Sequence, residues 1–261
     1  MSRLSLNDKF EKLTEIIRDM RGILIAFDGR LDSTLLLKSA LTALPANKVL
    51  AVTAFSAIYS PESIKKASTL AHVMRAKHLL VQTNEMSNPE FLKNGPDRCY
   101  YCKCELFAQL KNVAETRKLK FLVGDSNLTD LEERHCIRKA FDEFDVRMPL
   151  VEASLTREDV QKISEAIFLL GQDQKHSHCL ASRFSQNVRI TEDKLLAIYN
   201  SEKWLREKGF SKVTIRHHLE DIARIKLGTD KKSEFLDPTV SDAAILKLKE
   251  FGYKHVVLDL E

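Results

Sequence analysis

Cysteine residues give this chain its most direct chemical signal. Cys99 and Cys102 form a Cys-x-x-Cys pair, and this spacing lets two thiolates bind one metal ion. A tetrahedral site needs three or four ligands, and another cysteine, Cys179, lies in a separate polar segment. Considered alone, the pair is equally consistent with a zinc site, a redox couple or two buried thiols.

The segment around residue 28 has the pattern of an anion-binding turn. An apolar run at residues 23–27 predicts a buried strand, and leucines at helical spacing predict an amphipathic helix at residues 31–43. Backbone N–H groups at the start of a helix are unpaired and attract anions. The turn is therefore either a nucleotide phosphate site or a strand-to-helix connection without a ligand. Its residues, with those of the first helical turn, are Asp28, Gly29, Arg30, Asp32, Ser33 and Thr34.

The elements that would position these residues alternate between strand and helix. Strands are predicted at residues 23–27, 48–54, 77–82 and 121–124, with helices at residues 4–20, 31–43, 60–75 and up to about 118. This alternation predicts an α/β fold with a parallel sheet, in which phosphate-binding turns follow the carboxyl ends of strands. We expect polar loops at residues 84–98 and 125–134, and a helix capped by Thr156.

The C-terminal part has a different pattern. From residue 191 onward the predicted order is helix, two strands, helix and strand. These elements cover residues 191–208, 212–217, 221–227, 239–251 and 253–260. Such an order predicts a small α+β domain.

Composition indicates a globular protein that works inside the cell. Hydrophobic residues make up 44% of the 261 residues and charged residues 30%, which is enough to form a core. The net charge of +4 is too small to argue for a nucleic-acid partner, and no long apolar run suggests a signal peptide or a membrane span. We therefore expect a cytoplasmic protein whose five cysteines serve metal, cluster or thiol chemistry.

Three blocks that follow one another in the chain carry a resemblance to a known family. They are Arg98-Cys99-Tyr100-Tyr101-Cys102-Lys103, then Cys179-Leu180-Ala181-Ser182-Arg183-Phe184, then Arg216-His217-His218 with Asp221-Ile222-Ala223-Arg224-Ile225. The chain thereby resembles the LarE family, the ATP-dependent sulfur transferases that build the nickel-pincer cofactor of lactate racemase. The resemblance implies a PP-loop ATP-pyrophosphatase domain (adenine nucleotide alpha hydrolase-like) at residues 1–184. It also implies a small C-terminal α+β domain at residues 185–261 that supports a homo-oligomer.

Members of that family use ATP and Mg²⁺ to adenylate a pyridinium biscarboxylate mononucleotide, release pyrophosphate and install sulfur on the activated carboxylate. By this resemblance, Gly29, Arg30, Asp32 and Ser33 bind the nucleotide, and Asp32 also has a catalytic role. The family's loop reads Ser-Gly-Gly-x-Asp-Ser. Here Asp28 stands in place of the serine and Arg30 in place of the second glycine.

The cysteines also match the family. In one branch a single cysteine, matching Cys179, gives up its own sulfur and so has a catalytic role. In another branch a Cys-x-x-Cys pair, matching Cys99 and Cys102, joins that cysteine to hold a [4Fe–4S] cluster with one open iron. Because all three positions are cysteines here, we expect the cluster, with a zinc ion or no metal as alternatives.

Four further residues match family site residues. Ser182 and Arg183 correspond to residues that hold the substrate phosphate, and a guanidinium with a hydroxyl is well suited to that anion. Glu202 corresponds to an acidic site residue with a catalytic role. Arg216 corresponds to a basic residue of the binding site.

Several departures from the family pattern lie close to the chemistry. Besides the changes at Asp28 and Arg30, two carboxylates of the acidic loop are replaced by Leu128 and Thr129, and Lys226 stands where a glutamate is expected. They leave a second hypothesis, a catalytically degenerate relative that acts as a binding or scaffold protein. Another PP-loop enzyme, such as a tRNA thiolation enzyme, ranks below both because the chain has no strong basic stripe and its cysteine blocks match the LarE family.

Overall fold

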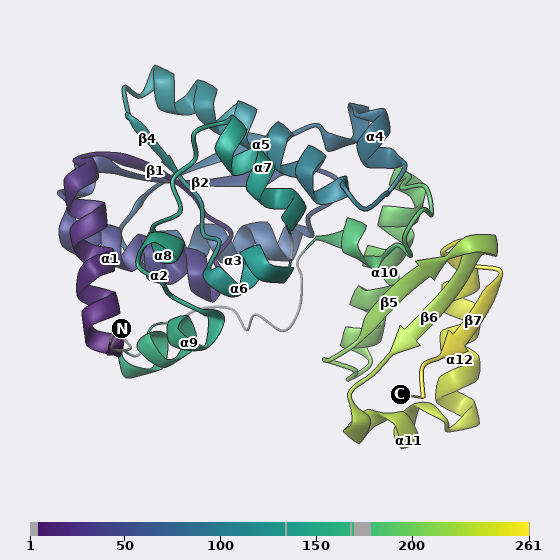
Figure 1. Cartoon of the computed structure of the whole chain (residues 1–261). Helices are drawn as coiled ribbons and strands as arrows, with labels where there is room; N and C mark the ends of the chain where they lie inside the picture. Colours follow the sequence, from purple (N-terminus) through teal and green to yellow (C-terminus); the bar gives the residue numbers. More distant parts are fainter. Residues whose placement is uncertain (1–4, 134, 168, 170–178, 261) are drawn as a thin grey trace. The chain divides into compact units, whose positions relative to one another are not determined.

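The computed structural model describes residues 5–133, 135–167, 169 and 179–260 of the chain. By internal contacts the chain divides into two compact units, coloured along the sequence in Figure 1. The first unit combines residues 1–56, 61–85 and 99–176, and the second combines residues 57–60, 86–98 and 177–261. No helix among the described residues is both long enough and apolar enough to cross a membrane.

A four-stranded parallel sheet forms the centre of the first unit. Its strands are β1 (Ile23–Ala26), β2 (Val49–Phe55), β3 (Lys77–Gln82) and β4 (Phe121–Val123), in the order β3-β2-β1-β4. Ile23 of the central strand is aligned with Val49 on one side and with Phe121 on the other. The four predicted strands and their parallel pairing are confirmed, and with them the α/β class.

Helices cover both faces of this sheet, as Figure 1 shows. On one face lie α1 (Leu6–Met20), α2 (Leu31–Ala43), α3 (Pro61–Val73), α8 (Pro149–Glu152) and α9 (Arg157–Ala166). The other face packs against α5 (Arg98–Thr116), α6 (Leu128–Glu133) and α7 (His135–Glu143). A strand buried on both faces reads as a continuous apolar run, which explains the pattern at residues 23–27.

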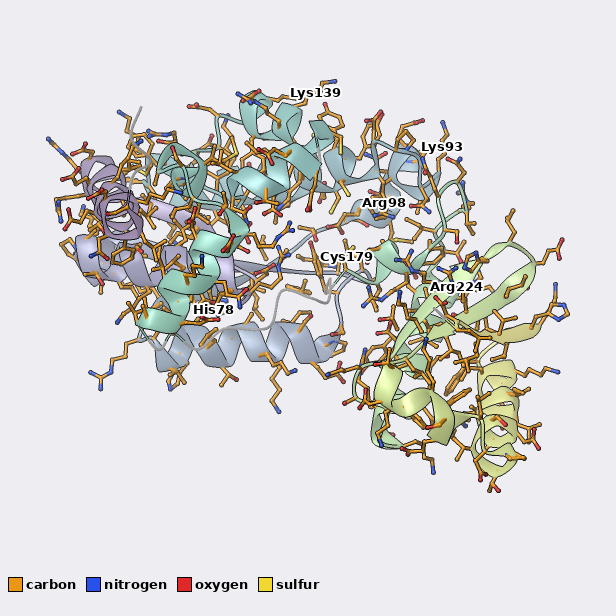
Figure 2. All side chains as sticks on the ribbon, turned by 60° about the horizontal axis from the view of Figure 1, so that its bottom comes forward. His78, Lys93, Arg98, Lys139, Cys179 and Arg224 are labelled. Carbon is orange, nitrogen blue, oxygen red and sulfur yellow. The ribbon has the colours of Figure 1, made fainter. Side chains whose placement is uncertain are left out.

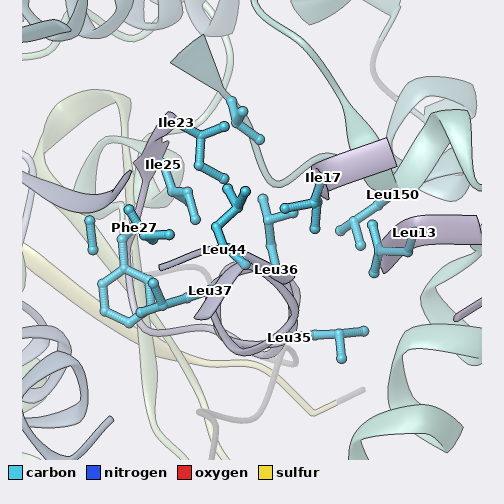
Figure 3. Packing of buried hydrophobic residues seen from close by; sticks show 14 of the residues in the cluster. Leu13, Ile17, Ile23, Ile25, Phe27, Leu35, Leu36, Leu37, Leu44 and Leu150 are labelled. Atoms are coloured by element: carbon cyan, nitrogen blue, oxygen red, sulfur yellow. The ribbon is translucent and has the colours of Figure 1, made fainter. Parts of the chain in front are cut away.

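Alternation along β1 supplies both halves of the core. Ile23 and Ile25 point into the cluster that contains Leu36 of α2, whereas Leu24 and Ala26 point into the cluster on the opposite face. Figure 3 shows the first cluster, with Ile23 and Ile25 of β1 and Leu35, Leu36 and Leu37 of α2 labelled. Truncating a fully buried leucine such as Leu36 removes about 2–5 kcal/mol of stability, so this packing fixes where α2 begins relative to β1.

The acidic segment at residues 125–134 is not a loop, contrary to the prediction. It contains α6, and α7 follows at once. The side chain of Asn127 accepts a hydrogen bond from the backbone N–H of Asp130 at 3.0 Å and so caps the start of α6. Leu131 and Phe141 are buried against the sheet. Long-range packing therefore makes these short helices, whose acidic sequence alone indicates a loop.

Thr156 caps α9 as predicted. Its side chain accepts a hydrogen bond from the backbone N–H of Asp159, and the Asp159 carboxylate accepts one from the backbone N–H of Thr156 at 3.0 Å. This reciprocal pair is a capping box, which satisfies two otherwise unpaired backbone donors.

The second unit is an α+β structure, as predicted from the order of its elements. It contains η3 (Leu180–Arg183), α10 (Glu192–Glu207), β5 (Thr214–His218), β6 (Ile222–Lys226), α11 (Lys232–Phe235), α12 (Pro238–Glu250) and β7 (His255–Leu258). The sheet order is β5-β6-β7, with β5 and β6 antiparallel and β6 and β7 parallel. The core of this unit contains Leu205 of α10, Ile215 and Ile225 of the sheet, and Leu248 of α12.

Earlier segments of the chain belong to this second unit through backbone hydrogen bonds. The N–H of Leu180 donates to the carbonyl of Ile58 at 2.8 Å, and the N–H of Ile190 donates to the carbonyl of Leu92 at 2.9 Å. Contacts therefore group the Cys179 segment with the C-terminal unit rather than with residues 1–56. The division into domains 1–184 and 185–261 stays a prediction.

Candidate functional site

The turn after β1 requires a glycine at residue 29. Gly29 has a φ of +75°, a backbone conformation that residues with a side chain rarely adopt. A Cβ at this position would also lie 3.1 Å from the Cα of Ala67 in α3. The glycine thus serves the packing of the turn as well as its conformation, and α2 begins directly afterwards at Leu31.

An internal carboxylate faces the donors of this turn. The side chain of Asp28 accepts hydrogen bonds from the backbone N–H of Arg30 at 2.9 Å and from the hydroxyl of Ser33 at 2.9 Å. It also accepts one from the Nε–H of Arg30. Burial alone would raise the pKa of Asp28, but the Arg30 charge and these hydrogen bonds lower it to about 2. Asp28 is therefore ionised at neutral pH.

Asp32, in the first turn of α2, is more deeply buried than Asp28. Its side chain is buried, and its Oδ1 accepts a hydrogen bond from the amide of Asn127 at 2.9 Å. Burial, followed by repulsion from Asp125, raises the pKa of Asp32 to about 7. The predicted catalytic carboxyl is thus about half protonated near neutral pH, which suits proton exchange.

Asp125 completes this acidic cluster from the neighbouring strand. It follows β4 by two residues and is buried, and its carboxylate lies 3.5 Å from the Nη2 of Arg30. Burial and the charge of Asp28 raise the pKa of Asp125, while Arg30 opposes that shift. The structure therefore brings the predicted residues Gly29, Arg30, Asp32 and Ser33 together at the carboxyl ends of β1 and β4, with two additional carboxylates.

The remaining acidic residues nearby are engaged by an arginine that sequence reasoning did not identify. Arg157 at the start of α9 contacts Asp130 and Glu133, each at 2.8 Å. These carboxylates raise the pKa of Arg157, Glu133 contributing most. No local pattern marks this contact, because the partners are separated by 24 and 27 residues. Because Asp130 and Glu133 are paired with Arg157, they do not simply replace the carboxylates that the family has at the positions of Leu128 and Thr129.

Cys99 and Cys102 lie on a helix, α5, and not in the preceding loop. Their spacing of three residues places them on the same side of its first turns, and both thiols are reduced and partly exposed. Within the described part of the chain, no group of three or more His, Cys, Asp or Glu side chains is arranged to hold a metal. The three-cysteine cluster site stays a prediction. Cys99, Cys104 and Cys136 each pack against the apolar cluster on this face of the sheet.

The Cys179 segment is held by its backbone. The carbonyl of Cys179 accepts hydrogen bonds from the hydroxyl of Ser182 at 2.7 Å and from its N–H at 3.0 Å. Arg98, labelled with Cys179 in Figure 2, donates to the carbonyl of Ala181 at 2.9 Å and to the side chain of Asn94 at 2.6 Å. Arg98 stands next to Cys99 in the sequence. Its hydrogen bonds to Ala181 and Asn94 nevertheless hold the segment that follows Cys179.

Glu202 is the buried centre of a charged network. Its Oε1 accepts hydrogen bonds from the Nε–H of Arg183 at 2.9 Å and from the backbone N–H of Ile215 at 3.1 Å. Its other oxygen pairs with Arg206, and the carboxylate is only 3% exposed. Glu202 thereby fixes the guanidinium of Arg183 beside β5. The predicted residues Ser182, Arg183 and Glu202 are brought together.

Arg216 is not part of that network. It is exposed on β5 and directly follows Ile215, whose backbone N–H binds Glu202. Its side chain therefore lies on the opposite face of the sheet from Ile215. No ion pair joins Arg216 to another described residue. Of the four residues in this part of the chain that match family site residues, the structure therefore places Ser182, Arg183 and Glu202 together and Arg216 on the opposite face of the sheet.

Comparison with known proteins gives relatives along almost the whole chain, although no family model matches it. A protein of Synechocystis sp. that carries no functional name is 34% identical over 98% of this chain and 95% of its own length. The pyridinium-3,5-bisthiocarboxylic acid mononucleotide synthase of Lactiplantibacillus plantarum is 30% identical over 98% of this chain and 92% of its own length. A protein of Methanocaldococcus jannaschii, also without a functional name, is 26% identical over 92% of this chain and 90% of its own.

Proposed function

We propose that this chain, which belongs to the LarE family of the pyridinium-3,5-bisthiocarboxylic acid mononucleotide synthase, replaces a carboxylate oxygen of a pyridinium mononucleotide with sulfur. The observation that carries the proposal is the 30% identity to that synthase over 98% of the chain. Ser182 and Arg183 closely follow Cys179 in the chain, and the contacts of Arg183 with Ser182 and Glu202 support the proposal.

The phosphate of the mononucleotide binds, in this proposal, to the side chains of Ser182 and Arg183, which we call the Ser182–Arg183 corner. The Arg183 guanidinium can form charge-assisted hydrogen bonds with a phosphate, and the Ser182 hydroxyl can add one when it releases the carbonyl of Cys179. The buried Glu202 carboxylate holds the Nε of Arg183, so this side chain is already oriented before the ligand arrives. Arg183 is a binding residue in this proposal, and Glu202 is a positioning residue, which refines its predicted catalytic role.

Sulfur reaches the substrate from Cys179 or from sulfide on a metal cluster. If Cys179 is the donor, its thiolate attacks the activated carboxyl carbon and displaces the leaving group, giving a thioester. Loss of the Cα proton and cleavage of the Cβ–Sγ bond then leave a thiocarboxylate on the substrate and dehydroalanine in the chain. If a [4Fe–4S] cluster is the source, Cys99, Cys102 and Cys179 are the residues that would hold it.

Activation of the carboxylate by ATP and Mg²⁺ is the most demanding part of the proposal. A carboxylate oxygen is a poor leaving group, and adenylation with release of pyrophosphate converts it into a good one. In the structure, however, Asp28 occupies the N–H of Arg30 and the hydroxyl of Ser33. These donors do not fit a pyrophosphate until Asp28 releases them.

That observation favours a second candidate function, a relative that binds the mononucleotide without activating it. The two candidates share the Ser182–Arg183 corner and differ in the use of ATP. They also share the Cys179 segment, because a protein that only binds or scaffolds can hold a cysteine-bound cluster without turning over substrate.

One reaction separates the two functions. Purified protein is incubated anaerobically with pyridinium-3,5-biscarboxylic acid mononucleotide, with and without ATP and Mg²⁺, and the substrate is analysed by mass spectrometry. Oxygen-to-sulfur exchange that requires ATP supports the enzyme, and the Arg183→Gln variant is expected to weaken substrate binding at least about tenfold. The exposed Arg189→Gln variant is the matched control. Binding without exchange favours the second candidate, and absence of both contradicts the two proposals together.

A further inference from the structure

Buried side-chain oxygen atoms gather in the first unit where β2 and β3 end. Ser56 directly follows β2 and Thr83 directly follows β3, and the last residues of these parallel strands, Phe55 and Gln82, are aligned with each other. The backbone N–H of Thr83 continues the pairing by donating to the carbonyl of Phe55 at 3.1 Å. The two hydroxyl residues are therefore neighbours at the carboxyl end of the sheet, and Glu85 adds a carboxylate two residues after Thr83.

Glu85 is a buried carboxylate without a hydrogen-bond donor. Its exposed fraction is 1%, and neither of its carboxylate oxygens has a hydrogen-bond partner among the described residues. The hydroxyls of Ser56 and Thr83 are close enough to lower its pKa, but they too have no partner of normal hydrogen-bond geometry in the described part of the chain. A buried carboxylate that lacks donors is costly when it is ionised, because it has lost its hydration.

A second carboxylate lies beside this group. Glu105 of α5 accepts a hydrogen bond from the backbone N–H of Asn84 at 2.9 Å and another from the side chain of Gln109 at 3.3 Å. Burial raises the pKa of Glu85, the two nearby hydroxyls oppose this shift, and the negative charge of Glu105 adds to it. The surroundings of Glu85 therefore combine oxygen atoms with negative charge, which favours a positively charged ligand.

We propose that Glu85, Ser56 and Thr83 bind an alkali-metal cation, Na⁺ or K⁺, at the carboxyl ends of β2 and β3. Hard cations take oxygen ligands, and one carboxylate with two hydroxyls supplies such ligands here. One monovalent cation neutralises the one fully buried charge. Divalent ions suit the place less well, because Mg²⁺ keeps several water molecules and Ca²⁺ takes about six to eight oxygen ligands.

The cation site is distinct from the phosphate turn after β1. The carboxylates of that turn belong to the ends of β1 and β4 and to the start of α2, whereas the residues of the cation site follow β2 and β3. The proposal does not depend on sulfur transfer or on ATP. A cation at this place connects the ends of two neighbouring strands, so its main expected effect is on the stability of the folded protein.

Thermal unfolding of the full-length protein tests the site. The melting temperature is measured at pH 8 in NaCl, in KCl and in choline chloride at equal ionic strength. A ligand that binds only the folded state raises the melting temperature in a concentration-dependent way. We expect a rise of about 3–6 °C over choline chloride when the cation is at about ten times its Kd. The salt that produces this rise at the lower concentration identifies Na⁺ or K⁺ as the preferred ion.

Three variants assign the effect to this site. Glu85→Gln keeps the shape of the side chain and removes its charge, so it should abolish the difference between the alkali salts and choline chloride. In choline chloride this variant should melt no lower than the parent, because an uncompensated buried charge is gone. Thr83→Val removes one ligand and should weaken the cation dependence at least about tenfold in concentration. Glu115→Gln, at an exposed position of α5, is the matched control and should behave like the parent.

The outcomes separate a cation from the alternatives. Equal melting temperatures of the parent in all three salts would mean that a proton or an ordered water molecule satisfies Glu85, and would overturn the proposal. A salt dependence that persists in Glu85→Gln, or that disappears equally in Glu115→Gln, would place the cation elsewhere and overturn it as well. Circular dichroism verifies that each variant is folded, and Thr83→Val alone decides the question if Glu85→Gln does not fold.

Discussion

The carboxylate of Asp28 accepts a hydrogen bond from the backbone N–H of Arg30 at 2.9 Å and another from its guanidinium. The hydroxyl of Ser33 donates to the same carboxylate at 2.9 Å. The turn after β1 therefore binds an anion that the chain itself supplies. A phosphate must compete with Asp28 for these donors. Asp28 is part of the chain and, with a pKa of about 2, is ionised at neutral pH.

The first prediction follows from this competition. Replacing both residues, Asp28→Ser with Arg30→Gly, frees the N–H groups at the start of α2 for a pyrophosphate. A carboxylate about 4 Å from a phosphate oxygen costs roughly 4 kcal/mol at an effective dielectric constant of about 20, and each 1.4 kcal/mol is about tenfold in affinity. Because Arg30 offsets part of this cost, we expect ATP with Mg²⁺ to bind the double variant at least about tenfold more tightly, measured by isothermal titration calorimetry.

The single variant Arg30→Gly separates two explanations of the parent's affinity. If Asp28 blocks the turn, removing Arg30 alone leaves an uncompensated carboxylate, and ATP binds more weakly than to the double variant. Tight binding by the parent that is lost in Arg30→Gly would instead mean that Arg30 itself neutralises the phosphates. That result would favour the ATP-dependent enzyme over the relative that only binds the mononucleotide.

Asp32 is expected to make stability depend on pH. Its pKa is about 7 in the folded protein, against an ordinary value of 3.8, so between these values the folded state holds a proton that the unfolded state releases. The contribution of Asp32 to the free energy of unfolding is therefore largest below about pH 4 and decreases as the pH rises to about 7. Asp32→Asn removes this dependence and can still accept the hydrogen bond from Asn127.

Urea unfolding of the parent and of Asp32→Asn at pH 5 and at pH 8 measures this effect. The variant should gain stability relative to the parent on going from pH 5 to pH 8. A stability difference that is the same at both pH values would mean that Asp32 titrates in its ordinary range. Asp125, whose pKa is also raised, is present in both proteins.

Local sequence patterns predicted the sheet well because its central strands β1 and β2 are buried along most of their length. The apolar run of β1 needs no information about distant residues, and the same holds for the alternating strands of the second unit. The helix α6 depends on Asn127 as its cap and on Leu131 packing against the sheet. Only the packing of Leu131 is a long-range contact. It outweighs the acidic composition of this segment, which by itself indicates a loop.

The candidate site was predictable in its residues but not in its contacts. The sequence shows an aspartate at position 28, yet the direction of its carboxylate depends on how the turn closes over Ala67. Likewise, Glu202 is one glutamate among many on an exposed-looking helix. Only the position of β5 shows that it binds the N–H of Ile215 and the guanidinium of Arg183.

Glu202 is expected to be important for stability. Glu202→Ala leaves two guanidinium groups and one backbone N–H without their acceptor. Breaking a buried ion pair from one side costs about 3–5 kcal/mol. Chemical unfolding should therefore show a loss of that order, whereas Glu207→Ala, an exposed position on the same helix, should change stability by less than about 0.5 kcal/mol. Equal stability of the two variants would show that the Glu202 network contributes nothing net.

The last prediction concerns the metal centre implied by Cys99, Cys102 and Cys179. Protein reconstituted with iron and sulfide under nitrogen is expected to show the broad visible absorption of thiolate-bound iron–sulfur centres. An alanine at any of the three positions should abolish it, because each removes a ligand. Cys136→Ala should not, since Cys136 matches none of the family's three cluster cysteines.

The pattern among these variants identifies the chemistry. Loss of absorption in all three variants supports the cluster. If Cys179→Ala keeps the absorption while Cys99→Ala and Cys102→Ala lose it, Cys179 is not a ligand and is left as a direct sulfur donor. In that case the mass of the protein after turnover should decrease by the mass of hydrogen sulfide, because cleavage of the Cβ–Sγ bond leaves dehydroalanine. A colourless protein that retains zinc by elemental analysis would contradict the iron–sulfur assignment and favour a zinc site at the Cys-x-x-Cys pair.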